Sequence, residues 1–196
     1  MIIHVVKATL VVAFATLLAG CQTALVDQFG PLSVRSVSVS AKPTVQSATD
    51  IKSVVAKAAT ATIVKDMPNG RPASVHITVN GVNYKNAVMS LLVGSANILG
   101  TTVSVTDRSG SVIAEFPLNE QADYIFNGVI GAAIAATQDL ADVDRKLSEE
   151  YAKSLAKRIY GDQAEQLPSA APAPTVSPSD ETAERKPARR RKVPVS

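Results

Sequence analysis

Apolar residues recur every three to four positions in two segments of the chain, which is the spacing of an amphipathic helix. The first segment begins after Thr49 or Asp50, either of which suits a helix cap, and stops at residues 67–70, Met-Pro-Asn-Gly. The second runs from about residue 139 to 160, and Gly161 ends it. We expect each helix to pack its apolar face against a core.

Alternating apolar and polar residues predict the strands. Valines in residues 34–39 indicate a first strand, and the change of phase between Val34 and Val37 indicates a β-bulge. Residues 74–79 also alternate and lead into Asn80-Gly81. This pair favours either a tight hairpin turn or a bulge in one long strand that reaches Tyr84.

A hairpin is predicted from residues 99–105 and 112–118, which flank Asp107-Arg108-Ser109-Gly110. Asp at the first position and Gly at the fourth suit a type I turn. The element order is then roughly β-α-β-β-β-α. This order predicts an α+β fold, an antiparallel sheet of three to five strands with two helices packed on one face.

Two apolar stretches, residues 87–93 and 125–136, contain no charged residue. The simpler interpretation is burial, with the first as a central element and the second as the tightly packed start of the last helix. The alternative is that one stretch faces a partner or dips toward a bilayer. Each is well short of the roughly 20 residues that a transmembrane helix needs.

The N-terminus has the features of a signal segment: Lys7, an apolar run over residues 8–19, and then the only cysteine of the chain, in Leu18-Ala19-Gly20-Cys21. The apolar run falls short of the roughly 20 residues that cross a bilayer, which disfavours a transmembrane helix. An ordinary secretory signal is the other alternative, and it would leave Cys21 as a single thiol on a secreted chain.

The tetrad resembles the lipobox of bacterial lipoproteins. This resemblance implies a signal peptide over residues 1–20, recognition of Leu18-Ala19-Gly20 by the lipoprotein signal peptidase, and a diacylglyceryl group on the Cys21 thiol. Gln22 is not the aspartate that retains such proteins in the inner membrane of enteric bacteria, so we expect an outer-membrane protein that faces the periplasm. No cofactor is expected besides this covalent lipid.

The mature chain divides into three parts by composition. We expect a lipid-anchored tether over residues 21–33, a single α+β domain over 34–161, and a disordered Pro/Ala-rich and basic tail over 162–196. The net charge of +3 comes from the tail, because residues 180–196 hold six cations and three acids while the remainder has 14 of each sign. The six cations are Arg185, Lys186, Arg189, Arg190, Arg191 and Lys192.

This basic segment suggests an anionic partner. For an exported, lipidated chain the partner is an anionic lipid, lipopolysaccharide or the cell wall, and not nucleic acid. The alternative is a solvated arm that only aids solubility.

Candidate catalytic and metal-binding residues are few. One histidine, His76, remains after signal removal, on the polar side of a predicted strand, with no second histidine to complete a zinc site. Acidic residues at the start of the last helix lack the spacing of a calcium loop and fit its solvated face and first turn. They are Asp139, Asp142, Asp144, Glu149 and Glu150. Phosphate-loop, dinucleotide and serine-hydrolase motifs are missing from the sequence, so we expect no enzyme and no metal site.

A second resemblance covers residues 34–160. In its lipobox, its hairpin over Val103–Glu115, its Gly128–Ala133 run and its terminal helix, the chain is similar to small uncharacterised envelope lipoproteins of proteobacteria. Members of that group resemble the smaller α/β domain of the translocation protein TolB. The resemblance implies a non-enzymatic binding or structural module at the outer membrane. The alternative function is an accessory lipoprotein subunit of an envelope export or assembly complex, with a protein partner.

Overall fold

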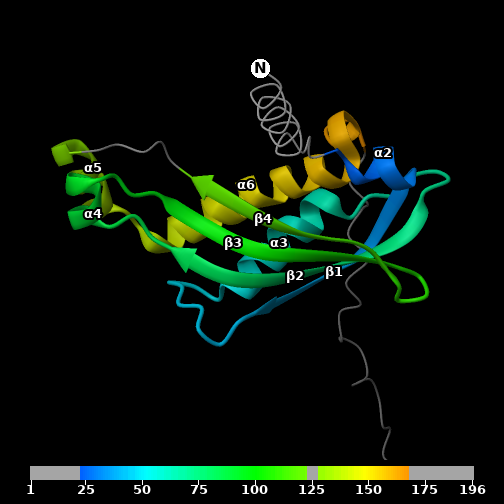
Figure 1. Ribbon diagram of the computed structural model, residues 1–196, viewed down its shortest axis with the longest axis horizontal. Coiled ribbons are helices and arrows are strands. Elements are labelled where there is room, and N and C mark those ends of the chain that lie inside the picture. Colours follow the sequence, from blue (N-terminus) through cyan, green and yellow to red (C-terminus); the bar gives the residue numbers. More distant parts are fainter. Residues whose placement is uncertain (1–22, 123–127, 168–196) are drawn as a thin grey trace, which may run out of the picture.

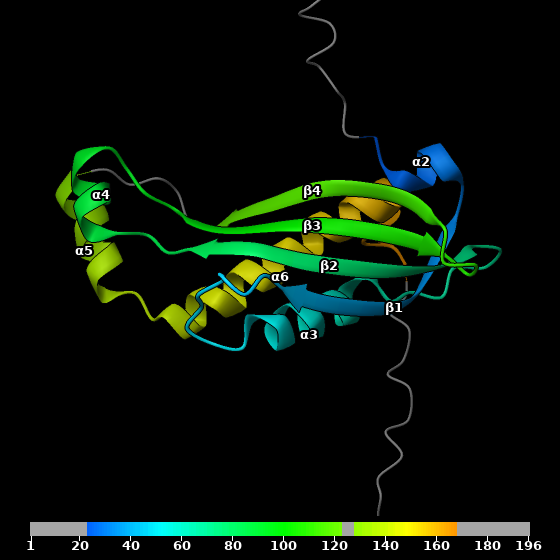
Figure 2. The same cartoon turned by 60° about the horizontal axis from the view of Figure 1, so that its bottom comes forward.

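A four-stranded β-sheet runs along the length of the protein in the order β1-β2-β3-β4 (Figure 1). The computed structural model describes residues 23–122 and 128–167. The strands are β1 (Leu32–Ala41), β2 (Arg71–Asn83), β3 (Asn97–Asp107) and β4 (Val112–Ala122). Two helices, α3 (Ile51–Ile63) and α6 (Leu140–Tyr160), pack side by side on one face of the sheet (Figure 1, Figure 2). This arrangement confirms the α+β class and the predicted order of the main elements.

The pair β1–β2 is parallel, so the sheet is mixed, and the prediction of antiparallel pairing does not hold for β1. A parallel pair needs a crossover connection, and α3 supplies it because this helix lies between the two strands in the chain. The pairs β2–β3 and β3–β4 are antiparallel, as expected.

The predictions from turn and bulge signals are confirmed. β1 has a register shift between Val34 and Ser36. In β2 the register shifts between Val79 and Gly81, so Asn80-Gly81 is a bulge in one long strand and not a hairpin turn. β3 and β4 form the expected hairpin, whose turn is closed by the N–H of Gly110, which donates to the C=O of Asp107 at 3.0 Å.

The core lies between the two long helices and the sheet. Its fully buried members include Val55 of α3, Ile77 of β2, Val103 of β3 and Leu147 of α6. Helical spacing and strand alternation place these side chains on the inward faces of their elements. Tyr160 of α6 is also buried, and its hydroxyl donates to a backbone carbonyl at the end of α3 at 2.7 Å. The core therefore ties the last helix to both the sheet and the other helix.

The segment expected to be a tether, residues 21–33, is largely folded where the structure describes it. It contains α2 (Leu25–Phe29), whose Leu25 is buried, and β1 begins within it at Leu32. A single buried leucine in so short a helix produces no periodic pattern that the sequence could reveal. The predicted signal peptide over residues 1–20 and the part of the predicted tail over 168–196 lie outside the described residues.

Two short helices, α4 (Ala87–Leu92) and α5 (Gly128–Thr137), contact each other at the end of the sheet opposite α2 (Figure 1, Figure 2). α4 connects β2 to β3, and α5 precedes α6 in the chain. α5 is a helix of its own, because the chain is not helical at residues 138–139, and it is not the start of the last helix as expected. Within the described ranges, every helix is too short or too polar to cross a membrane.

Candidate functional site

Exposed apolar side chains gather at one end of the molecule, on α4, the following Val93, and α5. We call this surface, residues 87–93 and 128–137, the tip. In the described part of the chain eleven large apolar side chains are exposed, and eight of them belong to the tip. They are Val88, Met89, Leu91, Leu92, Val93, Val129, Ile130 and Ile134. Leu92 is 70% exposed and Val129 is 76% exposed. Apolar patches of this kind on folded proteins mark sites that a partner or a membrane covers.

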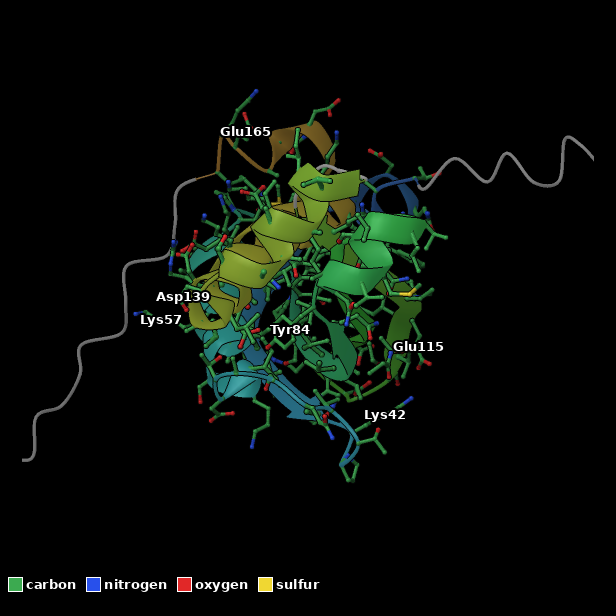
Figure 3. All side chains as sticks on the ribbon, turned by 90° about the vertical axis from the view of Figure 1, so that its left-hand side faces the viewer. Lys42, Lys57, Tyr84, Glu115, Asp139 and Glu165 are labelled. Carbon is green, nitrogen blue, oxygen red and sulfur yellow. The ribbon has the colours of Figure 1, made fainter. Side chains whose placement is uncertain are left out.

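The tip carries no charge. Residues 86–106 and 128–138 contain no acidic or basic side chain. Seen end-on (Figure 3), Tyr84 lies near the centre of the view, and the labelled charged side chains lie around its outside. These are Lys42, Lys57, Glu115, Asp139 and Glu165. The tip is therefore an uncharged apolar surface.

The exposure of the tip overturns the expectation that both uncharged stretches are buried, except for residues 125–127 of the second stretch, which lie outside the described residues. The only buried residue of α4 is Ser90, and the only one of α5 is Gly131. α3 and α6 already cover the inner face of the sheet, and the two short helices lie beyond its end (Figure 2). The alternative interpretation, a surface that faces a partner or a bilayer, agrees with this geometry. The lack of charge in both stretches was the one signal in the sequence.

A network of amide hydrogen bonds joins the tip to the body. Asn97, which is buried at the start of β3, accepts from the N–H of Lys85 at 2.7 Å and donates to the Gln138 side-chain oxygen at 3.2 Å. Gln138 donates in turn to the C=O of Lys85 at 3.0 Å. Because Lys85 precedes α4 and Gln138 follows α5, this network, which we call the neck, fixes both helices to the sheet.

A buried carboxylate binds the residue that follows β2, next to Lys85 of the neck. Asp144 of α6 is fully buried, and one of its oxygens accepts from the N–H and the hydroxyl of Thr49 at 3.0 and 2.7 Å. Its other oxygen accepts from the Tyr84 hydroxyl at 2.6 Å. Burial, and secondarily the hydrogen bond to Asp144, raise the pKa of Tyr84 to about 12. The prediction that Asp144 lies on the solvated face with the neighbouring acids is wrong, because its partners come from distant segments of the chain.

The other four acidic residues of this group lie at the surface, as predicted. Asp139 caps α6 by accepting from the N–H of Ala141 at 2.9 Å. Asp142 and Glu149 both pair with Arg145. Glu150 pairs with a lysine one turn further along the helix.

The end of the molecule opposite the tip holds both ends of the described domain. Arg158 of α6 donates to the C=O of Thr23. Lys65, which is buried, donates to the C=O groups of Ala164 and Leu167, each at 2.8 Å. Thr23 and Leu167 are thus both fixed at the α2 end of the body.

The site residues predicted from the lipobox and from the tail lie outside the described residues. They are Leu18, Ala19, Gly20 and Cys21 at one end, and Arg185, Lys186, Arg189, Arg190, Arg191 and Lys192 at the other. Lipid attachment and binding to an anionic surface therefore stay predictions.

His76 lies on the polar face of the sheet, where the alternation of β2 placed it. It is exposed, with Ser38 Oγ at 2.8 Å from its Nδ1 and Ser40 Oγ at 3.1 Å from its Nε2. Both ring nitrogens thus face hydroxyls of the neighbouring strand. Among the described residues there is no group of three or more His, Cys, Asp or Glu side chains that could hold a metal ion.

Comparison with known proteins finds distant matches among solved structures. No protein-family model matches the chain, and no curated protein matches it. A minor lipoprotein of Acinetobacter baumannii is 19% identical, with 72% of this chain and 100% of that chain covered and a TM-score of 0.40. A protein of Xanthomonas campestris is 12% identical, with 69% and 89% covered and a TM-score of 0.42. PelC of Paraburkholderia phytofirmans, a dodecamer, is 16% identical, with 62% and 86% covered and a TM-score of 0.35. Similarity at this level assigns no function to the chain.

Proposed function

We propose that this chain is a lipoprotein of the bacterial envelope, held at the outer membrane by a lipid on Cys21 and facing the periplasm. It acts as a non-enzymatic binding or structural module, and the tip is its interaction surface. The observation that carries the binding role is the exposure of eight large apolar side chains on one uncharged surface.

The position of the body relative to Cys21 supports a protein held close to its membrane. Thr23 is bonded to α6, and the two peptide units from Cys21 to Thr23 span at most about 8 Å. A lipid on Cys21 therefore keeps the α2 end of the body next to the bilayer surface. Two or three acyl chains make such attachment effectively permanent.

The basic tail acts near the same end of the body in this proposal. Leu167 is fixed there by Lys65, and residues 168–185 span at most about 60 Å. The six tail cations are thus within reach of anionic lipid headgroups, lipopolysaccharide phosphates or the cell wall. Each cation near an anionic surface contributes up to about 1 kcal/mol, and less as the salt concentration rises.

Anchoring is tested by intact mass and by fractionation. Protein purified from membranes should begin at Cys21 and carry two or three acyl chains. Cys21→Ala should be lost from the membrane fraction that resists salt extraction. The control Thr23→Ala keeps the thiol and should remain in that fraction. Persistence of Cys21→Ala in that fraction would contradict the anchor.

The exposed tip also favours a second function, an accessory subunit of an envelope export or assembly complex in which the body docks on a protein. Deleting residues 180–196 separates the two. Loss of wall or lipid binding supports the first function. Unchanged recovery of one stoichiometric protein partner supports the second.

A further inference from the structure

We propose that the tip inserts its aliphatic side chains into the surface of a lipid bilayer, so that the protein touches its membrane at two ends. One contact is the lipid on Cys21, and the other is the tip. This inference rests on the proposed function, because the lipid anchor is what brings the chain to a membrane.

The chemistry of the tip matches hydrocarbon better than it matches a protein partner. Its large exposed side chains are all Val, Leu, Ile or Met, and it has no charged residue. Protein interfaces are enriched in aromatic residues, arginine and methionine, and among the described residues of the tip only Met89 belongs to these types. A charge would be costly in the apolar layer of a bilayer, and its absence over both helices removes that cost.

N–H groups at both ends of α4 are paired within the chain, which matters in an apolar medium because an unpaired N–H or C=O costs several kcal/mol there. The Asn86 side chain accepts from the N–H groups of Val88 and Met89 at 2.9 and 3.1 Å. At the other end of α4, the N–H groups of Val93 and Gly94 both donate to the C=O of Met89 at 2.9 Å. These four N–H groups are therefore paired within the chain and do not need water as an acceptor.

α5 shows the same feature at its C-terminal end. The Thr137 hydroxyl donates to the C=O of Ala133 at 3.0 Å and lies 3.4 Å from the C=O of Ile134, which is one of the last four carbonyls of the helix. The only hydroxyl in this helix is thereby used inside it. These internal bonds lower the cost of placing the two short helices in the upper part of a bilayer.

The position of the anchor defines how the protein lies on the membrane. Thr23 is at the α2 end and the tip is at the other, and α6 alone extends about 30 Å between them. An upright body would hold the tip away from the bilayer, so contact at both ends requires the long axis to lie along the surface. In Figure 2, α2 and α4 both project past β4 at the two ends of the sheet, on the same side. This shape suits contact at two separate points.

Site-specific fluorescence on the lipidated protein tests this inference. Leu92→Cys and Ile130→Cys place a reactive thiol on each helix of the tip. The control is Thr60→Cys, because Thr60 is exposed on α3, which in Figure 2 lies on the β1 side, away from the β4 edge past which α2 and α4 project. Acylation blocks Cys21, so an environment-sensitive dye reacts only with the new thiol. The labelled proteins are reconstituted into phosphatidylcholine vesicles that contain a lipid-borne quencher. All three substitutions are at exposed positions, and circular dichroism verifies that they fold.

We expect quenching by the lipid to be severalfold stronger at residues 92 and 130 than at 60, and we expect Leu91→Asp to reduce the quenching at 130. Equal, weak quenching at all three positions in an acylated protein overturns the inference and leaves the anchor intact. The dye at residue 92 can instead be shielded from water without being quenched by lipid, and copies of the protein can crosslink to each other. This pair of results overturns the inference in favour of a second copy of the chain at the tip. A mature chain without acyl groups refutes the anchor and this inference together.

Discussion

Removal of the buried carboxylate of Asp144 should destabilise the protein far more than removal of an exposed acid. Asp144→Ala leaves three donors without their acceptor, the N–H and hydroxyl of Thr49 and the hydroxyl of Tyr84. A hydrogen bond to a charged group contributes about 1.5–3 kcal/mol to stability. Because Thr49 and Tyr84 are half-exposed and can rebind water, we expect a net loss of about 3 kcal/mol. That is a large share of the free energy of unfolding of a typical domain, which is roughly 5–15 kcal/mol.

Urea denaturation followed by circular dichroism measures this loss. The control is Asp142→Ala, an exposed acid whose partner Lys146 lies at 2.9 Å, and its removal should cost less than about 1 kcal/mol. Asp144→Asn keeps the shape and one acceptor oxygen, so its loss should fall between the two. If Asp144→Ala and Asp142→Ala have the same free energy of unfolding, the three hydrogen bonds to Asp144 do not stabilise the fold as its contacts suggest.

Three further outcomes follow from the structure. Asn97→Ala removes the centre of the neck, and we expect the free energy of unfolding to fall by about 1–3 kcal/mol. Amide hydrogen exchange should then be faster in α4 and α5 than in the sheet, and equal rates would argue against the neck. Gly161 has a φ of +62°, so Gly161→Ala should lower stability by about 1 kcal/mol and speed proteolysis of α2; an unchanged thermal midpoint and cleavage rate would contradict this. The pKa values of Tyr84 and Tyr160 are each raised to about 12 from 10, chiefly by burial. Between pH 10 and 12 the two tyrosine hydroxyls keep their protons in the folded chain but lose them in the unfolded chain, so the urea midpoint should fall as the pH rises over this range. In Tyr160→Phe the midpoint should fall less.

The parts of the fold that were predictable are those specified by neighbours in the sequence. The β3–β4 turn follows from Asp107 and Gly110, which close it within four residues. α6 follows from its apolar spacing, with Asp139 at one end and Gly161 at the other, and the structure places both at those ends. In each case the residues that end the helix or turn the chain are neighbours in the sequence of the apolar pattern that predicts the element.

The parts that were not predictable depend on contacts between distant segments. Asp144 lies beside Asp142 on α6, yet it is buried because it accepts hydrogen bonds from Thr49, which precedes α3, and from Tyr84, which follows β2. The parallel pairing of β1 with β2 is of the same kind, since it depends on the path of α3 across the sheet. α2 packs on α6 through a single turn of helix, too short to show a period.

The tip shows why apolar composition alone does not predict burial. Its two helices are uncharged, but α3 and α6 already occupy the inner face of the sheet, and the neck at Asn97 and Gln138 holds the short helices beyond its end. Apolar surface left in water costs about 25 cal/mol per Å². The fold nevertheless pairs N–H groups at both ends of α4 within the chain and keeps its side chains outward instead of folding them onto the core. An exposed apolar surface that is held in place by specific polar contacts is expected where a membrane or a partner covers it in the working protein.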